Sequence, residues 1–99
     1  MADAVSPAVT LTSTELNVGQ PGYLMCRVSG GNPRPLLQWI CNQKVEHARQ
    51  LSYQTYTLLL YSFISTEKHN GQICICYICQ LKTKFQPIQK SLTLQVSSK

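Results

Sequence analysis

The sequence predicts an all-β fold, and three observations lead to this prediction. β-Branched and aromatic residues are frequent along the 99-residue chain, and such residues favour strands over helices. Turn residues interrupt the chain about every ten positions, a spacing typical of sandwiches and barrels. Apolar and polar residues alternate in several segments, as they do in a strand with one buried face. We count about seven strands, and a chain of this length can bury one core.

The first half of the chain predicts three strands. Residues 9–12 form an edge strand, and residues 17–22 form a turn that leads to the second strand, residues 23–28. The loop at residues 29–35 contains two prolines and two glycines, which prevent regular structure. The third strand starts at residue 37. Alternation along the second and third strands directs six side chains toward the core: Leu24, Cys26, Val28, Leu37, Trp39 and Cys41.

The second half of the chain is less regular. Residues 42–50 are polar and lack a pattern, so they form either a connection or a short edge strand. Both alternating sets of side chains in residues 54–64 are apolar, so the sequence does not decide which set points toward the core. A turn at residues 65–71 precedes a strand at residues 72–79. After a basic loop, residues 90–96 form a closing strand with three inward side chains: Leu92, Leu94 and Val96.

The spacing of two cysteines and the single tryptophan resembles the immunoglobulin superfamily. Cys26 and Cys76 stand 50 residues apart with Trp39 between them, and all three lie on predicted inward faces. Members of this superfamily have a disulfide between their two sheets, packed by a buried tryptophan. The resemblance therefore implies an immunoglobulin-like β-sandwich of about seven antiparallel strands in two sheets, with a Cys26–Cys76 bond beside Trp39.

Two further motifs narrow the resemblance. Residues 29–35 followed by Trp39 look like the approach to the tryptophan in I-set and C2-type domains. His69-Asn70-Gly71 is similar to the turn before the second cysteine in nectins, nectin-like molecules, nephrin relatives and butyrophilin-type costimulatory ligands, although the acidic residue of that turn is absent here. We expect one such domain over residues 7–97, with residues 1–6 as an N-terminal extension.

Three cysteines depart from the family pattern. Cys74 replaces the tyrosine usually found two residues before the second cysteine, and Cys41 and Cys79 are extra. Antiparallel pairing of the Trp39 and Cys76 strands, as in the family, would place Cys41 opposite Cys74. These two then form either a second disulfide or a pair of buried thiols. Cys79 points outward as the odd thiol, available for an intermolecular disulfide or shielded by a neighbouring strand.

No catalytic or metal-binding constellation emerges from the sequence. Strand alternation sends Cys79 to the face opposite Cys74 and Cys76, so these thiols do not converge on a metal ion. Both histidines lie in connecting segments, and the four acidic residues are spread along the chain. We therefore expect a protein that is not an enzyme, with no cofactor and no metal.

A basic tip is the first candidate for binding. It combines charge with one aromatic anchor and suits an acidic protein or a sulfated glycan, although such charges also serve solubility alone. Single-stranded nucleic acid would need several stacking rings, so we expect no nucleic acid partner. The residues of this tip are Arg34, Lys82, Lys84 and Phe85.

The outer face of the sheet that holds Trp39 and Cys76 is the second candidate. Ile40, Ile75 and Tyr77 point outward from its two central strands. They form either an interface patch or a surface covered by loops.

Hydrophobic runs and cysteine content indicate where in or outside the cell the protein is located. The chain carries +5, and its uninterrupted apolar runs, such as residues 58–61, are too short to span a membrane, so we expect no direct membrane insertion. Five cysteines favour an oxidising compartment, hence an extracellular or cell-surface location.

The resemblance implies a non-catalytic recognition domain of a secreted or cell-surface protein, in cell adhesion or an immune receptor. Its partner would be a protein ligand or receptor, a second copy of the chain included. Two other roles fit the same fold. One is a structural spacer, in a muscle-type array or an ectodomain, and the other is an immune effector or pathogen-encoded receptor mimic.

Overall fold

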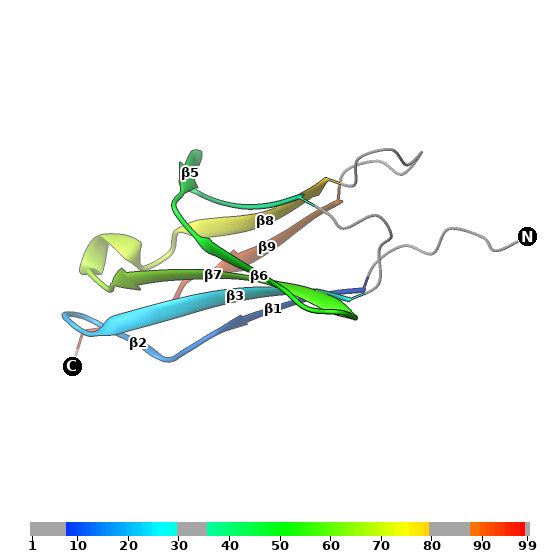
Figure 1. Cartoon of the computed structure of the whole chain (residues 1–99). Coiled ribbons are helices and arrows are strands. Elements are labelled where there is room, and N and C mark those ends of the chain that lie inside the picture. The colour runs from blue at the N-terminus through cyan, green and yellow to red at the C-terminus, as the bar shows by residue number, and fades with distance from the viewer. Residues whose placement is uncertain (1–7, 30–35, 80–87, 99) are drawn as a thin grey trace, which may run out of the picture.

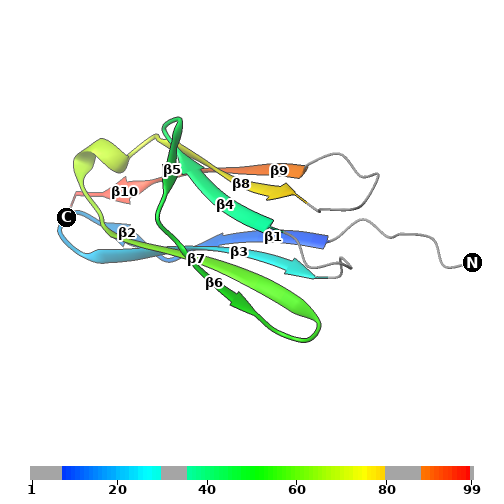
Figure 2. The same cartoon turned by 45° about the horizontal axis from the view of Figure 1, so that its top comes forward.

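Two four-stranded sheets face each other in the computed structural model, which describes residues 8–29, 36–79 and 88–98 (Figure 1). The β3–β7 sheet has the order β1-β3-β7-β6, and the β4–β8 sheet has the order β5-β4-β8-β9. All neighbours within these two sheets are antiparallel. A short parallel pair, β10 with β2, lies near the C-terminus (Figure 2). The predicted all-β sandwich is therefore confirmed.

The strands of each sheet have the following bounds. The β3–β7 sheet contains β1 (Ala8–Ser13), β3 (Pro21–Ser29), β6 (Arg49–Ser52) and β7 (Tyr56–Ile64). The β4–β8 sheet contains β4 (Leu36–Cys41), β5 (Lys44–Glu46), β8 (Ile73–Cys79) and β9 (Ile88–Thr93). The remaining elements are β2 (Leu16–Asn17), β10 (Val96–Ser97) and the short 3-10 helix η1 (Glu67–His69).

Alternation in the central strands matches the predicted inward sets. The six side chains expected to point inward from β3 and β4 are all buried, as are three from β8, namely Cys74, Cys76 and Ile78. Trp39 is fully enclosed, and its Nε1–H donates to the carbonyl oxygen of Leu59 on the facing sheet at 3.1 Å. The core therefore lies between the two sheets, with the tryptophan spanning them.

β7 directs one of its two alternating sets of side chains toward the core, and the sequence did not decide which one. Thr57 and Leu59 are buried, and Tyr61 and Phe63 pack against the core. The other parity, which includes Leu58 and Leu60, points away from the core on the outer side of the β3–β7 sheet and is only partly buried.

Two predicted segments are each divided in the structure. Residues 42–50 contain β5 and the start of β6, which belong to different sheets. Asn42 and Gln43 have φ of 52° and 67°, the backbone of a two-residue hairpin turn, so the chain folds back sharply after β4.

The expected single strand at residues 90–96 is also divided, into β9 and β10. The buried Leu94 between them donates its N–H to Gln72 at 2.8 Å, and beyond it the chain pairs with β2 instead of β8. A change of partner strand therefore ends β9. Leu92, Leu94 and Val96 nevertheless contact the core, as predicted.

Candidate recognition surfaces

Two disulfides brace the β4–β8 sheet. Cys26–Cys76 links β3 to β8 across the sandwich, with a Cα–Cα distance of 6.3 Å, and Trp39 lies directly opposite Cys76 in the adjacent strand. Both of these cysteines are fully buried. This bond therefore ties the two sheets together at the level of the tryptophan.

The second disulfide, Cys41–Cys74, lies within one sheet. The two residues are opposite each other in β4 and β8, with Cα atoms 4.2 Å apart. Of the two interpretations left open by the sequence, the structure contains the bridge. Cys74 stands where immunoglobulin domains have a tyrosine that hydrogen-bonds to the preceding turn, so a covalent link holds this end of β8.

The turn before β8 is held by its own side chains. Thr66 precedes η1, and its backbone N–H donates to Nδ1 of His69 at 2.9 Å. The His69 ring packs against the ring of Phe63 with centroids 4.7 Å apart. Gly71 has φ of 84°, a conformation that glycine adopts at little cost. His69 thus serves as a local brace.

The outer side of the β4–β8 sheet carries a continuous apolar row, which we call the β4–β8 outer face. The ladder places Ile40 directly opposite Val45 on one side and Ile75 on the other. Tyr77 and Ile73 extend the row along β8. Ile40, Ile75 and Tyr77 are partly buried, whereas Val45 is 62% exposed and Ile73 is 54% exposed.

Three apolar residues were not assigned to this face from the sequence: Leu36, Val45 and Ile73. Leu36 and Ile73 lie on the same outward-pointing alternation as Ile40 and Ile75, so that alternation could have identified them. Val45 lies in the unpatterned segment 42–50, where no periodicity assigned a direction to it.

The β4–β8 outer face is electrically neutral where the structure describes it. Besides its apolar residues, its outward positions are polar and uncharged: Gln38, Gln89, Ser91 and Thr93. Cys79, unpaired and partly exposed, lies opposite Leu36 at one end. An open hollow of about 580 Å³ borders the other end, between Ile73, Ile75 and the turn around Asn42.

The basic tip lies outside the described residues. Arg34, Lys82, Lys84 and Phe85 all fall in segments 30–35 and 80–87, so this surface stays a prediction.

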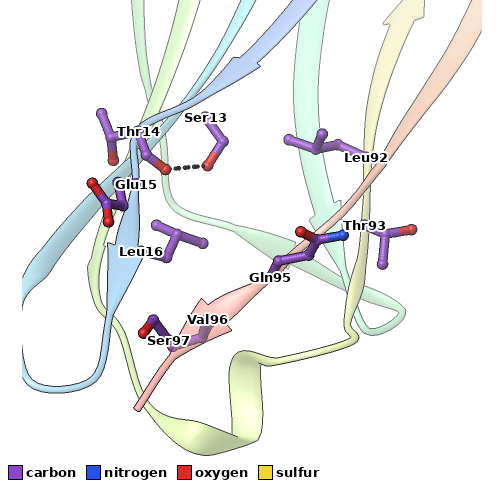
Figure 3. A pocket seen from close by; sticks show the side chains of 9 residues that line it. All are labelled: Ser13, Thr14, Glu15, Leu16, Leu92, Thr93, Gln95, Val96 and Ser97. Carbon is purple, nitrogen blue, oxygen red and sulfur yellow. Dashed lines mark hydrogen bonds between the residues drawn. The ribbon is translucent and has the colours of Figure 1, made fainter. Parts of the chain in front are cut away.

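A second hollow, of about 620 Å³, lies at the edge of the sandwich (Figure 3). It opens where the chain passes from β1 to β2 and where β9 passes to β10. Its lining mixes Leu92 and Val96 with hydroxyl, amide and carboxylate side chains, including Glu15. No group of three or more metal-ligating side chains occurs among the residues the structure describes.

One described side chain has a strongly shifted pKa. Burial, followed by the hydrogen bond that its hydroxyl donates to Glu46 at 2.8 Å, raises the pKa of Tyr61 to about 12. Tyr61 is therefore a protonated hydrogen-bond donor at neutral pH, joining β7 to β5 across the sandwich.

The strand order, the inter-sheet disulfide and the buried tryptophan define an immunoglobulin fold. Seven strands take the positions of the constant-type sandwich, with β5 added beside β4. No protein-family model and no curated protein matches the chain. In addition, none of the described helices is long and apolar enough to cross a membrane.

Solved structures show the same fold. The three-domain ectodomain of mouse nectin-like molecule 4 superimposes with a TM-score of 0.78 and 20% identity, over 92% of this chain and 33% of that one. The fourth constant domain of nurse shark IgNAR superimposes with a TM-score of 0.67 and 10% identity, over 95% of this chain and 99% of that one. This chain thus spans about a third of the nectin-like ectodomain.

Proposed function

We propose that the chain is a recognition domain of the immunoglobulin superfamily, belonging to a secreted or cell-surface protein, and that it binds a protein partner without catalysis. The observation that carries this proposal is the apolar row of Val45, Ile40 and Ile75 across three strands. Exposed, contiguous apolar patches on a folded domain are typical of interfaces.

The two disulfides support the extracellular setting and the binding role. Such bonds persist in oxidising compartments and are rare in the cytosol. They also fix β8 against β3 and β4, so little ordering entropy opposes binding at a face built on those strands. The nectin-like neighbour is itself an ectodomain, which agrees with this setting.

A second copy of the chain is a partner that this face fits. The chain carries +5, but two neutral faces meet without like charges in contact. The four strands of this sheet have 6, 3, 7 and 6 residues, which at about 3.3 Å per residue and about 4.8 Å per strand cover roughly 350 Å². This is less than half of the 800 Å² or so that each partner buries in a standard interface. We therefore expect weak self-association, in the micromolar to millimolar range.

Sedimentation equilibrium over a wide concentration range tests this proposal. The variant is Ile40→Thr with Ile75→Thr, which keeps strand-forming residues and replaces two of the three apolar residues in the row. The matched control is Leu58→Thr with Leu60→Thr, the same chemistry on the opposite sheet.

We expect wild type and control to self-associate with little dependence on salt, and the Ile40 and Ile75 variant to stay monomeric. A wild-type chain that is monomeric up to millimolar concentration would overturn self-association through this face. Equal association of all three proteins would place the contact elsewhere.

A further inference from the structure

We propose that the outer side of the opposite sheet is a second recognition surface, for a protein partner that presents apolar side chains beside carboxylates. We call it the β3–β7 outer face. It goes beyond the proposed function, because it involves a different sheet and partners of different chemistry.

The centre of this face is a group of four apolar side chains. The ladder places Met25 opposite Leu60, and Leu58 opposite Leu51. All four are partly exposed, and none of them belongs to the core or packs against it. Packing of the core therefore does not explain why these four positions are apolar.

β7 is unusual because it is apolar on both faces. An antiparallel strand with one side in water is expected to alternate apolar and polar residues. Thr57 and Leu59 already provide the inward side of β7, so Leu58 and Leu60 add nothing to the core. An apolar pair at solvent-facing positions of a central strand indicates a surface that a partner covers.

Two arginines flank this apolar centre on opposite sides. Arg27 lies opposite Leu58 in β3, and Arg49 lies opposite Leu60 in β6. Both are exposed. Two strand spacings and a two-residue offset separate their Cα atoms by roughly 12 Å, which places one guanidinium group on each side of the two leucines.

Aromatic residues extend the face beside Arg27. The Arg27 guanidinium lies 4.5 Å from the centroid of the Tyr56 ring, and Tyr53 stacks on Tyr56 with centroids 4.7 Å apart. Stacking on Tyr56 restricts the Arg27 side chain in the free protein, so this side chain loses less conformational entropy on binding. Arginine and tyrosine are also among the residues enriched at the energetic centres of protein interfaces.

The charge of the face indicates an acidic partner. The three described glutamates, Glu15, Glu46 and Glu67, occupy no outward position of this sheet, so both arginines present uncompensated positive charge. A second copy of the same face would bring arginines against arginines. A glycan would satisfy the arginines but not the four apolar side chains, so the combination favours an acidic protein surface.

A synthetic peptide that alternates Leu and Glu is the probe for this proposal. Its control has Gln in place of Glu, and a heparin oligosaccharide serves as the glycan probe. Binding is followed by amide NMR shifts and calorimetry with four proteins. These are the wild type, Arg27→Glu with Arg49→Glu, Leu58→Thr with Leu60→Thr, and Lys44→Glu with Lys90→Glu, which makes the same charge change on the other sheet.

We expect the Leu–Glu peptide to shift amides of β3, β6 and β7, and to bind the arginine variant and the leucine variant at least tenfold more weakly, an effect of about 1.4 kcal/mol. The lysine variant should bind as the wild type does. No binding of the peptide, equal binding of the Gln peptide, shifts confined to the β4–β8 outer face, or binding of the oligosaccharide alone would each overturn the proposal. Thermal unfolding of each variant separates loss of binding from loss of fold.

Discussion

Replacing Cys41 and Cys74 with alanine removes their disulfide and should lower the free energy of unfolding. The size of this loss depends on whether the Cys26–Cys76 disulfide is present. The two bonds are nested, because residues 41 and 74 lie inside the loop closed by Cys26–Cys76. A disulfide stabilises chiefly by restricting the unfolded chain, and its effect grows with the loop it closes. The relevant loop for each bond is therefore set by the presence of the other.

The loop lengths give the expected energies. Alone, the bond with sequence separation 50 would contribute about 4.1 kcal/mol, and the bond with separation 33 about 3.8 kcal/mol. With the inner bond present, the outer bond closes a ring of only about 19 residues, residues 26–41 and 74–76, which contributes about 3.2 kcal/mol. The two bonds together then contribute about 7 kcal/mol, so loss of the inner bond alone costs about 2.9 kcal/mol.

Urea unfolding followed by Trp39 fluorescence measures this cost, since the only tryptophan is fully buried in the native state. All proteins carry Cys79→Ser, so that thiol exchange does not intervene. We expect a loss of about 3 kcal/mol, equivalent to about 12–24 °C in Tm. Removal of both bonds should cost about 1 kcal/mol more than the sum of the two single removals. A loss below about 1 kcal/mol for the inner bond would refute the loop argument.

Three further predictions concern the interior. Gly22→Ala should destabilise by about 1–3 kcal/mol, because the added Cβ meets Leu16 and lies 3.0 Å from Oγ of Ser65; a neutral result in urea unfolding would show that Leu16 moves freely. Trp39→Phe should cost about 2–4 kcal/mol, since it opens a cavity and removes the hydrogen bond to Leu59; a loss under about 1 kcal/mol would contradict this role. The folded pKa of Tyr61, about 12, is above its ordinary value of 10.0, so its contribution to stability is complete below about pH 10 and is lost as pH rises through 12. Ultraviolet titration should find a late phase that Tyr61→Phe removes. Glu46→Gln should lower the pKa of Tyr61 only in part, because burial is the larger cause of its shift; a late phase that survives Tyr61→Phe would be the contrary result.

Alternation explains why much of the sandwich could be predicted. Along β3, β4 and β8 the inward side chains are apolar or cysteine at every second position, and a buried face has no other inexpensive composition. The resemblance then supplied the pairing of Trp39 with Cys76, from which the position of Cys41 opposite Cys74 followed. Whether those two thiols were bonded depends on the distance between the backbones of β4 and β8, which no sequence pattern encodes.

Pairing partners explain why the rest could not be predicted. The short strands β5 and β6 belong to different sheets, and nothing in residues 42–50 marks the crossing between them. Val45 acquires its outward direction from pairing with Ile40, a tertiary contact. Likewise, β9 ends because the following residues change partner to β2, while their apolar alternation continues without a break.

Concentration-dependent amide NMR of the isotope-labelled domain locates the face on which self-recognition occurs. We expect that raising the concentration shifts and broadens amides of β4, β5 and β8, around Ile40, Val45 and Ile75. Amides around Leu58 and Leu60 should stay unchanged. Shifts confined to the β3–β7 sheet, or none at millimolar concentration, would contradict the assignment of the β4–β8 outer face as a self-recognition surface.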